Sequence, residues 1–130
     1  MNHSDLILGI DVVYLHTPHP ELADWYTDVL GLSKGYGDGH WQEFSLQSGG
    51  RFALDFTSFP RSVVEKQSVM ISYRVTDIAE AVQVFTERGV KFFNSADGVI
   101  FDAGPSLVAT FQDPDGNWLQ LSQAKDELSR

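Results

Sequence analysis

An internal repeat constrains the fold of this 130-residue chain more than any other feature of its sequence. When Val12 is aligned with Ile71, a strand-like segment and the amphipathic helix that follows it coincide in both halves. A second match, near the end of each half, aligns Asp55 with Gln120. Because further strand-like segments follow each helix, the predicted order of elements is strand, helix and three strands, repeated once.

Hydrophobic periodicity sets the predicted bounds of these elements. Helical spacing runs from residue 21 to Gly31 and from Asp77, the predicted N-cap, to Gly89. The sequence predicts an α+β protein in which one domain contains two βαβββ modules, at 6–58 and 68–123, with a connector at 59–67. We expect a pseudo-twofold axis between the modules, so that their curved sheets form a shared cleft. Alternation typical of strands covers residues 6–17, 40–47, 51–58, 68–75, 107–112 and 118–122, with a shorter segment at 91–93. The Gly-rich residues 35–39 are predicted to form a loop or hairpin.

Charge and composition exclude several classes of partner. Asp and Glu number 18 against 9 Lys and Arg, which gives a formal net charge of −9. This charge repels phosphate, so neither nucleic acid nor an anionic membrane surface is an expected partner. The absence of cysteine excludes disulfides and thiolate metal sites. With no signal-peptide pattern and no apolar run long enough to span a membrane, the sequence predicts a cytoplasmic protein.

Three stretches of the chain resemble motifs of a known superfamily. They are residues 25–32 (WYTDVLGL), 75–82 (VTDIAEAV) and 111–121 (FQDPDGNWLQL). Together they are similar to the vicinal oxygen chelate superfamily, which includes glyoxalase I, extradiol dioxygenases and bleomycin-resistance proteins. The resemblance extends over nearly the whole chain and implies the two-module fold. It leaves function open, because one fold supports several chemistries and also binding without catalysis.

The resemblance also implies where a metal would bind. Metal enzymes of this superfamily carry ligands at four strand positions, which correspond here to Asp11, Asp55, Met70 and Gln120. The internal repeat pairs the same residues, Asp11 with Met70 and Asp55 with Gln120. The family's usual ligands are His, Gln and Glu, and no His occupies any of the four positions. The sequence therefore favours no cofactor, and a hard divalent metal on Asp11, Asp55 and Gln120 is the alternative.

Two further side chains are expected on the cleft side of the second module. Arg74 is four residues after Met70 in the same predicted strand, so both side chains should point to the same face. On that face Arg74 could neutralise a carboxylate or bind an anionic group of a ligand. Trp118 shares parity with Gln120 and is the predicted stacking residue. Arg74 reaching into solvent at the strand end remains an equally good interpretation.

The histidines are weaker candidates for contact with a ligand or metal in the cleft. His16 has the opposite parity from Asp11, so it is predicted to face the helix or the strand end. His40, which opens a strand beside the cleft, is the predicted histidine contact for a ligand or a proton.

Three functions remain open at this point. The favoured one is binding of a small molecule, as in the bleomycin-resistance branch, by stacking an aromatic ligand and pairing its cation with Asp11, Asp55 or Glu43. A metal-dependent enzyme is the alternative, either a glyoxalase I-like lyase or isomerase or a dioxygenase, with no catalytic residue assigned. An interaction protein with a vestigial cleft is the third. The resemblance further implies a homodimer.

Overall fold

The computed structural model describes residues 6, 8, 10–56 and 69–128. For residues 127 and 128 it describes the backbone alone. The chain divides into two units, Met1–Arg61 and Ser62–Arg130. Both carry the predicted order of strand, helix and three strands, which confirms the α+β prediction. The predicted connector at 59–67 lies outside the described residues, and the pseudo-twofold axis and shared cleft stay predictions.

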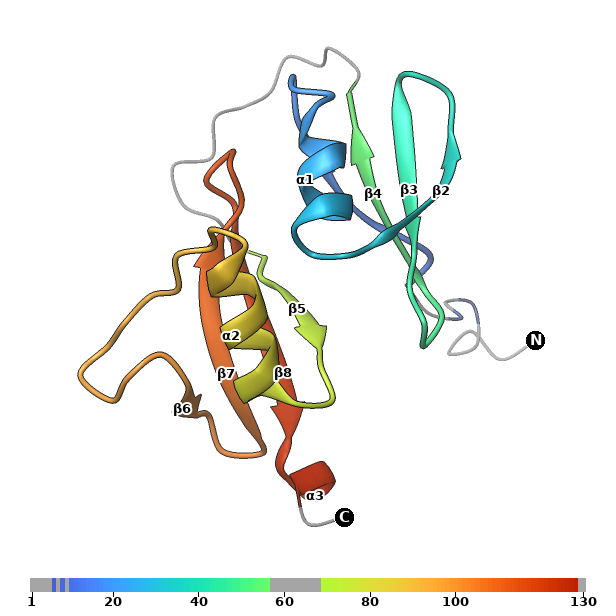
Figure 1. The fold of residues 1–130 in the computed structure, drawn as a ribbon. Coiled ribbons are helices and arrows are strands. Elements are labelled where there is room, and N and C mark those ends of the chain that lie inside the picture. The colour runs from blue at the N-terminus through green and yellow to red at the C-terminus, as the bar shows by residue number, and fades with distance from the viewer. Residues whose placement is uncertain (1–5, 7, 9, 57–68, 129–130) are drawn as a thin grey trace. The chain divides into compact units, whose positions relative to one another are not determined.

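The first unit is a four-stranded sheet with one helix on one face (Figure 1). The strand order is β1-β4-β3-β2, in which β1 runs parallel to β4 and the other neighbours are antiparallel. The β3–β4 turn contains Gly49 and Gly50, both at positive φ, as the Ser-Gly-Gly sequence indicates. The elements are β1 (Val13–His16), α1 (Leu22–Asp28), β2 (Ser33–Gly37), β3 (Trp41–Ser45) and β4 (Arg51–Asp55).

An aromatic cluster packs α1 against this sheet. The ring of Tyr26 lies 5.0 Å from that of Phe52 and 5.8 Å from that of Phe44, and all three side chains are buried. Since side chains alternate along a strand, the neighbours of Phe44 and Phe52 point away from α1. We call this second surface the helix-distal face. Strand registers assign to it Tyr14, His16, Trp41, Glu43, Arg51, Ala53 and Asp55.

The second unit repeats this arrangement, with strand order β5-β8-β7-β6 and α2 lying across β7 and β8 (Figure 1). Asp77 caps α2 as predicted, because its Oδ1 accepts a hydrogen bond from the Glu80 backbone N–H at 3.1 Å. Gln123, buried in β8, accepts the Ile78 backbone N–H at 2.8 Å. The elements are β5 (Ile71–Arg74), α2 (Ile78–Glu87), β6 (Phe101–Asp102), β7 (Ser106–Gln112), β8 (Trp118–Ala124) and α3 (Lys125–Leu128). None of the described helices has the length and apolar character needed to cross a membrane.

Two predicted strands are wrong in their bounds. The strand expected at 6–17 is confined to β1, and Asp11 lies before it in irregular backbone. Residues 91–93 form no strand, although Phe92 makes an isolated bridge to Phe111; the first strand after α2 is β6 instead. In both places the apolar composition is typical of a strand, but no regular ladder forms at these residues.

The strand registers also correct the predicted correspondence between residues of the two halves. His16 at the end of β1 pairs with Asp55, and Arg74 at the end of β5 pairs with Ser122. In each sheet the next backbone N–H along the chain bonds to the carbonyl of that β4 or β8 residue. Asp55 therefore corresponds to Ser122 and not to Gln120. The same registers align Val13 with Ile71, so Met70 corresponds to Val12 and not to Asp11.

Candidate functional site

Aromatic and ionisable side chains gather on the helix-distal face of the first sheet. Tyr14 is its most exposed aromatic residue, with 46% of its surface accessible. The ring of Tyr14 meets those of Trp41, at 5.1 Å, and His16, at 5.5 Å, in edge-on contacts. The two aromatic side chains come from β1 and β3, which are separated by β4, and they form an aromatic surface across three strands.

Glu43 fixes the position of the indole. Its Oε2 accepts a hydrogen bond from Trp41 Nε1 at 2.9 Å and another from the Arg51 guanidinium at 2.9 Å. The Glu43 side chain is only 17% exposed, so both bonds are partly shielded from water. A half-buried carboxylate thus lies directly beside the aromatic surface.

Arg51 connects two carboxylates. Its second terminal nitrogen donates to Asp11 Oδ2 at 2.7 Å. The hydrogen bond to Asp11, followed by the charges of Asp11 and Glu43, raises the pKa of the Arg51 guanidinium. Asp11 therefore lies at the helix-distal face, as the partner of a cation and in irregular backbone. Because Arg51 and Asp11 are exposed, water and salt screen this pair.

His16 faces Asp55 from the last position of β1, so of the two predicted positions, the helix side and the strand end, the structure shows the strand end. His16 Nδ1 lies 3.0 Å from Asp55 Oδ2, and the side chains are 38% and 8% exposed respectively. The two strands run parallel, and their register brings the ends of β1 and β4 together. The helix-side alternative is wrong because it counted alternation from Asp11, and the irregular backbone between Asp11 and Val13 interrupts that alternation.

The structure gives His40 a different environment from the predicted one. This residue lies in the exposed turn before β3, where its backbone N–H bonds to Asp38 Oδ1 at 2.9 Å and its carbonyl accepts from the Phe56 N–H. The ligand contact expected of His40 stays a prediction.

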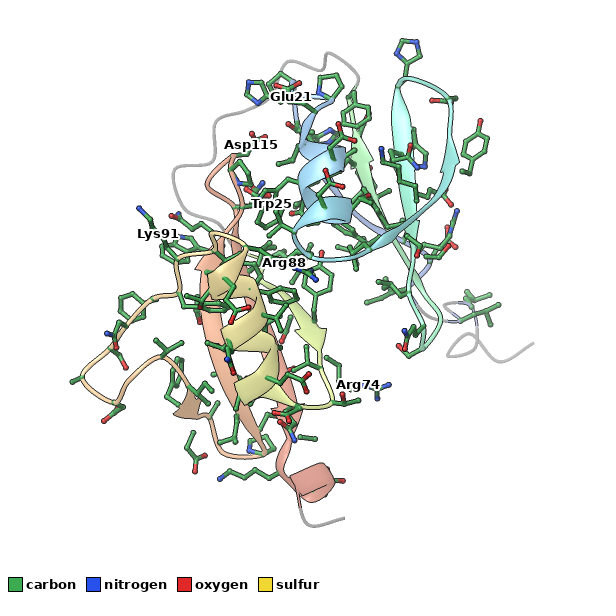
Figure 2. All side chains as sticks on the ribbon, in the orientation of Figure 1. Glu21, Trp25, Arg74, Arg88, Lys91 and Asp115 are labelled. Atoms are coloured by element: carbon green, nitrogen blue, oxygen red, sulfur yellow. The ribbon has the colours of Figure 1, made fainter. Side chains whose placement is uncertain are left out.

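The corresponding face of the second sheet has different chemistry. Gln120 and Trp118 share that face with Arg74, as predicted, and Ser122 lies there too. Arg74 is exposed and extends outward from the end of β5 (Figure 2). Met70 is exposed just before β5. Within the described strands of this sheet, no acidic side chain lies on the helix-distal face.

The carboxylates of the first sheet do not fit a metal centre. A hard divalent cation needs several oxygen ligands that converge on one point. Asp11 is instead bonded to the Arg51 guanidinium and Asp55 faces His16. Across the described part of the chain, no three His, Asp or Glu side chains form a group that could hold a metal ion. The trio of Asp11, Asp55 and Gln120 remains a prediction that no contact supports.

Two four-stranded sheets, each with a helix on one face and the connectivity βαβββ, define a protein built from a repeated α+β module. The chain belongs to the Glyoxalase/Bleomycin resistance protein/Dioxygenase superfamily, whose family model matches residues 13–121. This confirms the resemblance seen in the sequence. No curated protein matches the sequence significantly.

Several solved structures are similar to this fold. A glyoxalase/bleomycin resistance protein/dioxygenase from Nocardioides has a TM-score of 0.69 at 20% identity, over 93% of this chain and 88% of that one. TnmS3, an antibiotic binding protein from Streptomyces sp. CB03234, has a TM-score of 0.66 at 23% identity, over 91% and 98%. TioX from Micromonospora sp. ML1 has a TM-score of 0.65 at 18% identity, over 89% and 98%. At these identities the likeness establishes the shared fold.

Proposed function

We propose that this chain binds a small, positively charged aromatic molecule on the helix-distal face of the first sheet. The observation that carries the proposal is the position of Glu43. Its carboxylate orients Trp41, which lies edge-on to the exposed ring of Tyr14. A flat ligand on these rings would bring its cationic group within reach of a half-buried carboxylate.

The charge balance of this face favours a cation over an anion. This face carries three carboxylates, from Asp11, Glu43 and Asp55, and one guanidinium, from Arg51, which pairs with Asp11 and Glu43 while Asp55 faces His16. Even with His16 protonated, these side chains keep a net negative charge, and the whole chain, which includes them, has a formal net charge of −9. A cation is therefore attracted both at long range and on contact. An anionic ligand would meet the opposite field.

The relatives support a binding role. One protein of this fold is described as an antibiotic binding protein, so the scaffold serves small-molecule capture elsewhere. A metal-dependent lyase, isomerase or dioxygenase would need a converging donor set, which the first sheet does not provide. A homodimer acting in the cytoplasm is part of the same proposal, and light scattering at micromolar concentration tests the dimer.

Calorimetric titration with N-methylquinolinium tests the binding site, with uncharged quinoline as the matched probe. We expect the cation to bind more tightly than quinoline. We also expect Trp41→Ala and Glu43→Gln each to weaken the cation by about fivefold or more, since a partly desolvated cation–π or ionic contact contributes about 1 kcal/mol or more. The control is Phe93→Ala, which removes an exposed aromatic of the second unit.

Equal affinity for the two probes would overturn the cationic preference. Loss of binding in Trp118→Ala, with Trp41→Ala unchanged, would overturn the placement on the first sheet. A stoichiometric transition metal in protein purified without metal resin would favour the enzymatic alternative.

A further inference from the structure

The chain contains three Asp-Gly dipeptides, each in a turn or loop. An aspartate that precedes glycine can rearrange to isoaspartate, because the glycine nitrogen can attack the carboxyl group and no glycine side chain obstructs the approach. The three dipeptides share this reactivity, so the surrounding structure decides which of them reacts first. They are Asp38 with Gly39, before β3, Asp97 with Gly98, between α2 and β6, and Asp115 with Gly116, between β7 and β8.

Hydrogen bonds hold two of the three glycine nitrogens. The Gly98 N–H donates to the Ser95 carbonyl at 2.9 Å, and the Ser95 N–H donates back to the Gly98 carbonyl at 3.1 Å. The Gly116 N–H donates to the Asp113 carbonyl at 2.9 Å. A nitrogen bonded in this way is directed at its acceptor, and its hydrogen bond must break before it can attack a neighbouring carboxyl group. The turns therefore protect these two dipeptides.

The nitrogen of Gly39 has no such protection. Across the described residues, its N–H reaches no hydrogen-bond acceptor within the protein. Both Asp38 and Gly39 are exposed to solvent. The Gly39 nitrogen is therefore available for reaction without prior opening of the fold.

The carboxyl group of Asp38 is also held in place beside this nitrogen. Its Oδ1 accepts the His40 backbone N–H at 2.9 Å, and its Oδ2 accepts the Tyr36 hydroxyl at 3.4 Å. An aspartate that bonds to the N–H two residues further on forms an Asx turn, in which the carboxyl group folds back over the intervening backbone. The intervening nitrogen is that of Gly39, so the two reacting groups lie in one turn.

We propose that Asp38 and Gly39 form the site at which the folded protein converts to isoaspartate. The Gly39 nitrogen bonds to Cγ of the protonated Asp38 carboxyl group, and the amide hydrogen leaves with the carboxyl hydroxyl as water. The product is a cyclic succinimide. Water then adds to the former backbone carbonyl of Asp38 and breaks its bond to the Gly39 nitrogen. The main chain now runs through Cγ, and solvent water is the only reactant consumed.

The conversion changes the turn that leads into β3. The Asp38 N–H donates to the Trp41 carbonyl at 3.1 Å and closes this turn. Isoaspartate adds one methylene group to the main chain inside the turn and leaves a free α-carboxylate. The site thus lies next to one of the two aromatic residues proposed to bind a ligand, although its chemistry does not depend on that binding.

Peptide mapping of the folded full-length protein, aged at mildly acidic pH, tests this proposal. Mass spectrometry with electron-transfer fragmentation distinguishes isoaspartate from aspartate at each dipeptide. We expect isoaspartate at residue 38 to form faster than at residue 97 or 115 by about fivefold or more, because at those two sites a hydrogen bond must break first. In protein unfolded by urea, the three rates should become similar.

The matched variant is Asp38→Glu, which keeps the charge but would have to close a larger ring. We expect it to lose the signal at residue 38 and to leave the signals at residues 97 and 115 unchanged. Equal rates at the three sites in the folded protein would refute the proposal. So would an intact Asp38 in the folded protein, under conditions in which the unfolded protein converts at all three sites.

Discussion

The two principal helices begin with different caps, and this difference allows a controlled test of what Asp77 contributes. Asp77 precedes α2 in extended backbone and its side chain accepts the Glu80 N–H. Glu21 precedes α1 in helical backbone, and its side chain makes no cap hydrogen bond (Figure 2). We expect Asp77→Ala to lower the free energy of unfolding by about 1 kcal/mol, since that is the usual contribution of a side-chain N-cap. Glu21→Ala should have a much smaller effect.

The shift in melting temperature also depends on how much of the chain unfolds together. The entropy of unfolding is about 2.1 cal/mol/K per residue. If all 130 residues unfold in one transition, a loss of about 1 kcal/mol lowers Tm by about 4 °C. If the second unit, Ser62–Arg130, unfolds separately, the same loss lowers its Tm by about 7 °C.

Differential scanning calorimetry of wild type, Asp77→Ala, Asp77→Asn and Glu21→Ala measures these shifts. Asn is an equally good N-cap, so Asp77→Asn should stay close to wild type. The reasoning fails if Asp77→Asn is as destabilising as Asp77→Ala, or if Glu21→Ala costs as much as Asp77→Ala.

Two other substitutions in the second unit have expected outcomes. Gln123→Leu leaves the Ile78 N–H without its buried acceptor and should cost about 1–3 kcal/mol in urea unfolding; an unchanged midpoint would contradict this. Burial, and then the charge of Asp113, raise the pKa of Tyr73 in the folded state. Its stabilising contribution is therefore complete below the ordinary tyrosine pKa of about 10 and is lost as the pH rises above it, by up to about 1.4 kcal/mol per pH unit. Tyr73→Phe should flatten the alkaline decline in Tm, and identical declines in the two proteins would refute this explanation.

Hydrophobic patterning predicted the elements that bury a face, but not β2 (Ser33–Gly37), which is exposed along its length and lies where a loop or hairpin was expected. Residues such as Phe44 and Phe52 must alternate with polar neighbours if one face of a sheet packs on a helix. The same logic assigned Gln120 and Trp118 to one face. The cap of α2 was also predictable, since Asp77 and Glu80 stand at the spacing of a capping box.

The paired side chains of the candidate site could not be predicted in this way. His16 and Asp55 meet because two parallel strands adopt one register, and register depends on backbone pairing between distant segments. A slip of one residue reverses every side chain, so aligning the halves by their apolar residues was not accurate enough. The irregular backbone at Asp11 also changes which face the following side chains point to. No local sequence signal marks where β1 begins.

The correspondence between the ends of the two parallel strand pairs offers a route to engineering. His16 and Asp55 occupy the positions that Arg74 and Ser122 occupy in the second sheet. The double substitution Arg74→His and Ser122→Asp would therefore transplant the pair onto a scaffold with the same register. The second unit then serves as the host for the pair, in a sheet that contains neither Tyr14 nor Trp41.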